Sequence, residues 1–283
     1  MNICSFCFSK NLKLIWIGYP RAGNLNNFST NLSKVFRCIK CKSIKLNHSE
    51  KYDDTNFISG NYRNSVSDKH QYKEIFTEKV VFLNEISNYT YNKYILDFGC
   101  GHGHLLKLLA NFNKKLVGLE LDKNFHFKNN NILVTNNFNN SDKFVKKFDV
   151  IFIFSTLIMI EEPIKLIKEF KKRLNKNGII IVGDINAEDM LVDYGKKKYE
   201  KIFYRLSCKN YPSKKGLKLL FEKANFKLIN HKYIERYDYK NFRQYLDLNK
   251  ISYQKEELSK EKFIETKIKN RGTDYLITIF KKQ

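Results

Sequence analysis

The chain has 283 residues, of which 42% are hydrophobic and 29% charged. This composition excludes a disordered chain, and the length suffices for one large domain with a small satellite. The longest apolar run, residues 150–160, is too short to span a bilayer, and residues 1–7 lack the basic start and apolar core of a signal peptide. We therefore expect a cytoplasmic protein with reduced thiols and no membrane partner.

The formal net charge of +23 comes from 44 lysines and only 8 arginines, and the lysines are scattered along the chain. A nucleic-acid or acidic-membrane partner is one interpretation of this charge. We favour solvated surface lysines, because arginines that bind phosphate in a bidentate manner are scarce. An anionic substrate, such as a nucleotide-linked sugar, remains compatible with a basic surface.

Two cysteine pairs mark the N-terminus, as Cys4-Ser-Phe-Cys7 and Cys38-Ile-Lys-Cys41. Two such pairs match a tetrahedral site in which four thiolates bind zinc. Short strand-like runs at 12–17 and 34–37 lie between them, so we predict a zinc-ribbon-like lobe over residues 1–50 with a structural zinc. Four unrelated thiols, or a redox pair, are the alternatives.

Residues 51–93 form a linking segment that becomes helical after Asp68. Apolar side chains recur there at helical spacing, and Ser67 or Asp68 can cap the helix. Tyr62 and Arg63 stand just before this helix and are placed to reach a ligand. Ordinary linker residues would give the same pattern.

A strand, a glycine-rich loop and a helix follow from Tyr94. The strand Tyr94–Leu96 leads into Asp97-Phe-Gly-Cys-Gly-His-Gly103, and a leucine-rich helical pattern comes next. The glycines Gly99, Gly101 and Gly103 let the chain turn sharply and let its N–H groups approach a ligand. The loop therefore predicts a binding site at the end of this strand.

The following segments alternate between strands and helices. Strands are expected at 115–121, 132–135, 148–155 and 178–184, with a helix beginning near Pro163 and ending at 177–178. After a helix that begins at Pro212 and Ser213, further strands are expected at 227–234 and 271–280, with a charged helical run at 254–269 between them. This alternation predicts a doubly wound α/β sheet.

Asp97 restricts what the loop can bind. A carboxylate two residues before Gly99 would repel a pyrophosphate but can accept a hydrogen bond from an ammonium group. The third glycine of the dinucleotide pattern is also missing, since His104 stands there. A dehydrogenase is the weaker alternative, as is a metal cluster of Cys100, His102 and His104.

These motifs resemble the class I S-adenosylmethionine-dependent methyltransferases: Asp97-x-Gly-x-Gly-x-Gly103, Glu120 after the second strand, and Gly178 followed by four apolar residues. The resemblance implies a seven-stranded Rossmann-like sheet over residues 94–283. It also implies that Asp97 and the three glycines hold the methionine part of S-adenosylmethionine and that Glu120 holds the ribose. Asn137 or Phe138 would flank the adenine.

A narrower similarity, to the bacterial group that contains deoxysugar C-methyltransferases and polysaccharide-cluster methyltransferases, rests on Arg37–Cys41, Leu46–Asn47 and Asn61–Ser67. Relatives in this group often carry His-x-Leu-Glu-His after the fourth strand. Here the run is Ser155–Met159, without the Glu or either His, so no acid–base role carries over.

We therefore predict methyl transfer to a small-molecule acceptor: a sugar, nucleotide-sugar or glycan. The alternative is an RNA or protein methyltransferase that uses the zinc lobe to bind its substrate, which a clustered Arg/Lys face would favour. A third possibility is a fold that no longer binds cofactor. Asp184, Asn186, His102 and Tyr62 are candidates to face the cleft, and neither a catalytic base nor an oligomeric state is predicted from the sequence.

Overall fold

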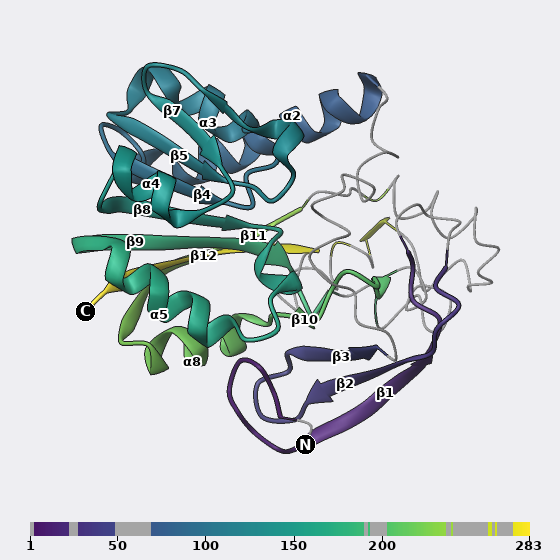
Figure 1. The fold of residues 1–283 in the computed structure, drawn as a ribbon. Coiled ribbons are helices and arrows are strands. Elements are labelled where there is room, and N and C mark those ends of the chain that lie inside the picture. The colour runs from purple at the N-terminus through teal and green to yellow at the C-terminus, as the bar shows by residue number, and fades with distance from the viewer. Residues whose placement is uncertain are drawn as a thin grey trace.

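The computed structural model describes residues 3–22, 28–48, 69–189, 203–235 and 274–283, together with residues 192, 239, 260, 261 and 264, and gives only the backbone of 69–77. Figure 1 shows a large sheet with helices on both faces and a smaller sheet built mainly from the N-terminal part of the chain. Several sequence predictions lie outside the described residues: Tyr62, Arg63, the 61–67 motif, the caps Ser67 and Asp68, and most of the run 254–269.

The large sheet has the strand order β11-β12-β9-β8-β4-β5-β7-β6. Its seven long strands confirm those expected from the sequence: β4 (Tyr94–Phe98), β5 (Lys115–Leu119), β7 (Ile132–Thr135), β8 (Phe148–Phe154), β9 (Leu174–Ile185), β11 (Phe226–Ile234) and β12 (Tyr275–Lys282). The strands from β7 to β9 pair in parallel, and β12 is antiparallel to both of its neighbours. The two-residue β6 (Phe127–Lys128) adds an eighth, antiparallel strand.

Two helical layers cover this sheet. The helices α2 (Lys69–Ile86) and α3 (His104–Leu109) pack on one face through side chains such as Phe82 and Leu105. The other face carries α4 (Phe138–Phe144), α5 (Pro163–Arg173) and α8 (Lys214–Lys223), which contribute Phe170 and Leu220 to a second core. Four single turns of 3₁₀ helix lie in the described part of the large domain: η1 (Ser87–Tyr89), η2 (Ala110–Phe112), η3 (Lys123–Phe125) and η4 (Leu157–Met159).

The junction between α5 and β9 differs from the sequence prediction. We expected the helix to end at Asn177 and Gly178, but it ends at Arg173 and β9 begins at Leu174. Leu174 pairs with Phe148, and the register shifts before the next pair. Burial of Leu174 in the core therefore overrides the turn tendency of the Asn-Gly pair.

The small sheet has the order β1-β2-β3-β10 and is antiparallel. Its first three strands, β1 (Leu12–Gly18), β2 (Ser33–Cys38) and β3 (Ile44–His48), belong to residues 3–22 and 28–48, which we call the N-terminal lobe. The fourth, β10 (Asn210–Tyr211), comes from the chain after β9 and pairs with Lys45 and Ile44. The lobe is thus joined to the large domain through its own sheet.

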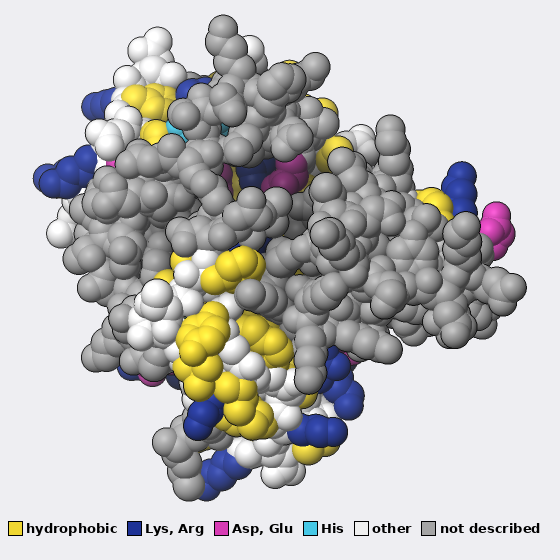
Figure 2. Space-filling model, turned by 90° about the vertical axis from the view of Figure 1, so that its right-hand side faces the viewer, with side chains coloured by type: hydrophobic (Ala, Val, Ile, Leu, Met, Phe, Trp, Pro, Cys, Tyr) yellow, Lys and Arg dark blue, Asp and Glu magenta, His cyan; other side chains and the backbone are white. Residues whose placement is uncertain are grey.

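Side chains of the lobe continue both cores. Val35 and Leu46 belong to the same apolar cluster as Tyr204 and Tyr211. Figure 2 shows hydrophobic side chains gathered on the part of the surface where Figure 1 places the lobe, and along β1 the side chains of Leu14 and Ile17 are about half exposed. Among the described residues, each helix is too short or too polar to cross a membrane.

Candidate functional site

The glycine-rich loop leaves the carboxyl end of β4 in a left-handed conformation. Gly99, Gly101 and Gly103 have φ values of +75°, +57° and +67°, which residues other than glycine rarely adopt. A Cβ at Gly99 would lie 2.3 Å from Thr156 Oγ1, just beyond β8. The loop is therefore pressed against the end of the neighbouring strand, where parallel-sheet proteins bind ligands.

Glu120, which follows β5, binds the glycine-rich loop through a hydrogen bond. Its Oε2 accepts a hydrogen bond from the Gly101 N–H at 2.8 Å, and its Oε1 accepts one from the Asp122 N–H at 3.2 Å. The residue is buried, and its own N–H donates to the Thr135 carbonyl of the third strand. A carboxylate accepts about four hydrogen bonds, so this anchoring is compatible with binding a ribose diol.

Asp97 is buried near the end of β4, only 4% exposed. Burial raises the pKa of this carboxyl to about 7, while the positive charge of Lys79 lowers it and the charge of Glu120 raises it. The Lys79 Nζ lies on α2, 3.5 Å from Glu78 Oε1 and 5.0 Å from the centre of the Phe82 ring. A buried carboxyl of this kind gains strongly from a bound cation, so it fits an ammonium group.

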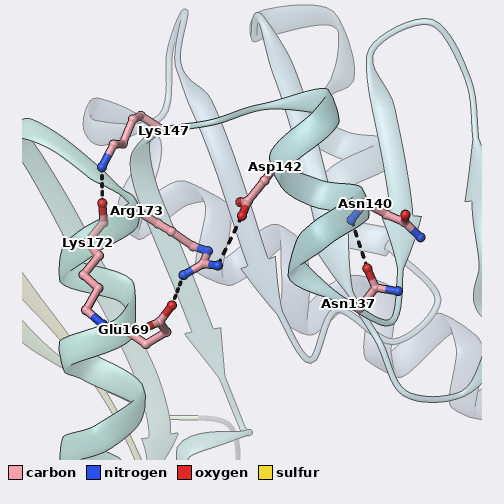
Figure 3. Close-up of polar contacts among 7 residues, drawn as sticks. All are labelled: Asn137, Asn140, Asp142, Lys147, Glu169, Lys172 and Arg173. Carbon is pink, nitrogen blue, oxygen red and sulfur yellow. Dashed lines mark hydrogen bonds and ion pairs between the residues drawn. The ribbon is translucent and has the colours of Figure 1, made fainter.

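Asn137 and Phe138 begin α4 beyond β7. Asn137 is the N-cap, and its Oδ1 accepts from the Asn140 N–H at 2.9 Å, as Figure 3 shows. The Phe138 ring packs against α5, with its centre 4.0 Å from Arg173 Cζ and 6.2 Å from the Phe170 ring. Of these two residues, the exposed Asn137 lies clear of α5 and Phe138 does not.

The other sequence candidates have contacts of a structural kind. Asp184 is fully buried, and its carboxylate accepts from the Ile158 and Ile185 N–H groups. Asn186 Oδ1 accepts from the Glu188 N–H at 3.1 Å. The His102 ring lies 3.9 Å from that of Phe125 and stacks on His104. Thr156, which the sequence analysis did not select, lies just beyond β8 beside Gly99, so that a Cβ at Gly99 would clash with its Oγ1.

Within the described part of the chain, one group of His, Cys, Asp or Glu side chains is close enough to hold a metal: Cys4, Cys7, Cys38 and Cys41. Their sulfur atoms all lie within 4.8 Å of one another, with Cys4 and Cys41 at 3.6 Å and Cys7 and Cys38 at 3.4 Å. All four are free thiols. Tetrahedral zinc with bonds of about 2.3 Å places its sulfurs about 3.8 Å apart, so the group fits zinc.

The two cysteine turns have the same backbone geometry. The N–H of Phe8 donates to the Cys4 carbonyl at 3.0 Å, and the N–H of Lys42 donates to the Cys38 carbonyl at 2.9 Å. Phe8 and Lys42 are each the residue after the second cysteine, and both have positive φ, 59° and 67°. Left-handed backbone at a residue other than glycine is strained, so the turns are held in a shape that points both sulfurs to one place.

The second turn docks on the first turn of α8. Ser213 caps this helix, and its Oγ accepts from the Gly216 N–H and donates to the Cys41 carbonyl. The Ser213 N–H donates to Ser43 Oγ at 3.0 Å. The sequence predicted a helix beginning at Pro212 and Ser213, but not that its cap would contact a cysteine turn 172 residues earlier.

Four features together define a class I S-adenosylmethionine-dependent methyltransferase: the strand order of the large sheet, the left-handed glycine loop, Asp97 in β4 and Glu120 just after β5. The profile of the methyltransferase domain family matches residues 69–231. The chain belongs to this family.

Solved structures of the same fold agree. The chain is similar to a S-adenosylmethionine-dependent methyltransferase from Archaeoglobus fulgidus, with a TM-score of 0.53 and 16% identity over 76% of this chain and 100% of the other. It is also similar to magnesium protoporphyrin IX methyltransferase from Synechocystis, with a TM-score of 0.52 and 11% identity over 81% and 97% of the two chains. At these identities the likeness establishes the fold alone.

Relatives by sequence include a tRNA U34 carboxymethyltransferase of Campylobacter jejuni, 30% identical over 158 residues, which are 52% of each chain. An enzyme of the same name from Nautilia profundicola is 31% identical over 153 residues, or 48% of each chain. An uncharacterised methyltransferase of Oceanobacillus iheyensis is 28% identical over 58% of this chain and 84% of its own length. The chain spans about half the length of the tRNA enzymes that it matches.

Proposed function

We propose that this chain transfers a methyl group from S-adenosylmethionine to a nucleotide of an RNA. The assignment of the cofactor rests on one observation: Asp97, the three left-handed glycines and Glu120 lie together at one edge of the sheet. The buried carboxyl of Asp97 suits the ammonium group of the methionine part, and the glycines let the backbone come close to that part. The carboxylate of Glu120 suits the two hydroxyl groups of the ribose.

S-adenosylmethionine supplies a methyl group that is already activated on a sulfonium, so the protein mainly has to position the donor and the acceptor. We assign Asp97, Gly99, Gly101 and Gly103 to the methionine part and Glu120 to the ribose. Asn137 is a better partner for the adenine than Phe138, whose ring is used in packing against α5. We assign no general base, because Asp184 and Asn186 already accept hydrogen bonds from backbone N–H groups.

The RNA acceptor is supported by the sequence relatives, whose names identify them as tRNA enzymes. The sugar, nucleotide-sugar or glycan acceptor that the sequence favoured has no such support, because neither of these relatives is named for a sugar substrate. The N-terminal lobe adds a second surface, because Ile39 and Lys40 are exposed at the tip of its second cysteine turn. Apolar and basic groups side by side suit contact with RNA bases and phosphates.

We further propose that the four cysteines hold a structural zinc. Four protein ligands close the tetrahedral site, so the metal would stabilise the lobe and take no part in methyl transfer. The boundaries 1–50, 51–93 and 94–283 are proposed as the lobe, the linking segment and the methyltransferase domain. The lobe and the methyltransferase domain are joined by β10.

The test is transfer of an isotope-labelled methyl group to unmodified bulk tRNA and, in parallel, to a panel of nucleotide-sugars. We expect label in the RNA, and loss of label with Asp97→Asn. Label in a nucleotide-sugar but not in RNA would refute the acceptor and leave the cofactor assignment intact. Calorimetry that detects no binding of S-adenosylmethionine at millimolar concentration would refute both.

A further inference from the structure

Lysines gather at the edge of the large sheet that lies opposite the glycine-rich loop. The parallel strands begin at this edge, α5 and α8 end there, and β12 ends there because it runs antiparallel. Ten basic side chains lie at the ends of α5, α8, β8, β9, β11 and β12: Lys146, Lys147, Lys171, Lys172, Arg173, Lys176, Lys223, Lys227, Lys281 and Lys282. We call this set the basic edge.

Hydrogen bonds show that the basic edge is one surface and not separate charges. Lys147, before β8, donates to the carbonyl of Lys172, and Lys282, at the end of β12, donates to the carbonyl of Leu174 at 2.9 Å. Lys171 Nζ donates to the carbonyls of residues 224 and 225, both at 3.1 Å. The ammonium groups of Lys147 and Lys282 therefore lie at the junction of α5 and β9, and that of Lys171 lies at the end of α8.

The negative groups at this edge do not balance these charges. Glu169 and Asp142 both form ion pairs with Arg173, as Figure 3 shows, and Glu169 also lies 3.1 Å from Lys172 Nζ. Asp149 accepts hydrogen bonds from the Tyr94 N–H and from Asn175. The C-terminal dipoles of α5 and α8 contribute only about half a negative charge each.

Three of these lysines lie close enough to influence one another. The pKa of Lys282 is lowered, first by burial and then by the charges of Lys147 and Lys171. Like charges held close together repel one another, and a bound polyanion relieves that repulsion.

From this geometry we infer that the basic edge is a docking surface for the phosphate backbone of RNA. The inference rests on the proposed function and adds a second contact far from the methyl-transfer site. Nine of the ten side chains are lysines, which contact phosphates as point charges and do not read bases. A strand of five to seven residues, about 20 Å, separates the edge from the glycine loop. A small acceptor would touch one edge only, whereas a folded RNA can reach both.

The experiment compares two variants, each with four exposed lysines replaced by glutamine. The edge variant changes Lys147, Lys172, Lys176 and Lys281, and the control variant changes Lys107, Lys165, Lys168 and Lys218, which are exposed and lie outside both the basic edge and the N-terminal lobe. Fluorescence anisotropy measures binding of a labelled, unmodified tRNA transcript between about 50 and 200 mM salt. Binding of S-adenosylmethionine by calorimetry reports that each variant is folded.

For the edge variant we expect binding at least about tenfold weaker near 100 mM salt, and a slope of log K against log salt reduced by about three. The control variant should keep the wild-type slope. Equal losses in both variants would overturn the inference, as would wild-type binding to phosphatidylserine vesicles without binding to tRNA. Methyl transfer to tRNA with an unchanged slope would refute the docking surface alone. An edge-dependent slope without RNA methylation would refute the proposed acceptor chemistry alone.

Discussion

The buried carboxyl of Asp97 makes cofactor binding depend on pH. Its pKa is raised from 3.8 to about 7, so the group is mostly protonated at pH 6 and mostly ionised at pH 8. Only the carboxylate can form a charge-assisted bond with the ammonium of S-adenosylmethionine. Affinity is therefore nearly complete at pH 8, half lost in its pH-dependent part near pH 7, and lower still as the pH falls. For one titrating group the dissociation constant at pH 6 should be about ten times that at pH 8.

The raised pKa of Asp97 also means that ionisation of this carboxyl lowers the stability of the folded protein. A carboxyl whose pKa is raised on folding stabilises the protein only while protonated, so this contribution is lost as the pH rises from about 4 to 7. The difference between 3.8 and about 7 corresponds to about 4 kcal/mol. Asp97→Asn removes the ionisation. The variant should therefore unfold at higher urea concentration than the wild type at pH 8, by up to that free energy, and bind cofactor about 10- to 100-fold more weakly.

Isothermal titration of S-adenosylmethionine from pH 6 to pH 8 checks this reasoning, with urea unfolding of the same samples. Lys79→Gln removes the positive charge that lowers the pKa of Asp97, so it should move the midpoint of the affinity curve to higher pH. Asp142→Asn, whose carboxylate pairs with Arg173 of α5, is the matched control and should leave the curve unchanged. A wild-type affinity that is constant across this range, or an Asp97→Asn variant with the same pH dependence, would refute the assignment.

Three other predictions concern the lobe. Gly216→Ala should destabilise the protein by about 1–3 kcal/mol in urea unfolding, because its Cβ would lie 2.0 Å from Ser43 Oγ, and a gain in stability would contradict this junction. Lys42→Gly should preserve or raise the free energy of unfolding in urea, while Lys42→Val should lower it by about 1–2 kcal/mol, because the φ of 67° is strained for a β-branched residue. Equal unfolding midpoints of the two variants would show that the turn is not strained. Removal of metal by a chelator should change the fluorescence of Trp16, the only tryptophan of the chain, whose ring centre lies 5.1 Å from that of Tyr204, and it should leave cofactor binding intact. Elemental analysis that finds no zinc in protein purified without chelator would refute the zinc proposal.

The sequence was informative where the signal is local. Apolar runs located the long strands, and the spacing of Cys4, Cys7, Cys38 and Cys41 located the thiol cluster. The position of Glu120 just after β5 was also predicted correctly, although its bond to the loop N–H of Gly101 was not foreseen. Short-range patterns of this kind follow from strand periodicity and turn geometry.

Long-range contacts were beyond the sequence. Lys147, Lys171 and Lys282 are scattered along the chain, and they meet only because β8, α5 and β12 place them at one sheet edge. The two residues of β10 carry no strand signal of their own and gain their conformation from pairing with β3. The orientation of Phe138 toward α5 likewise depends on Arg173 and Phe170, which are distant in sequence.

The pairing of β3 with β10 sets an order of events during synthesis. Ser43 and its partner Ser213 are 170 residues apart, so β3 emerges from the ribosome roughly 10–30 s before its neighbour. During that interval the hydrogen-bonding edge of β3 is open, and an open edge can pair with other chains. A metal captured early by the cysteine turns would fix the strands of the lobe while they wait.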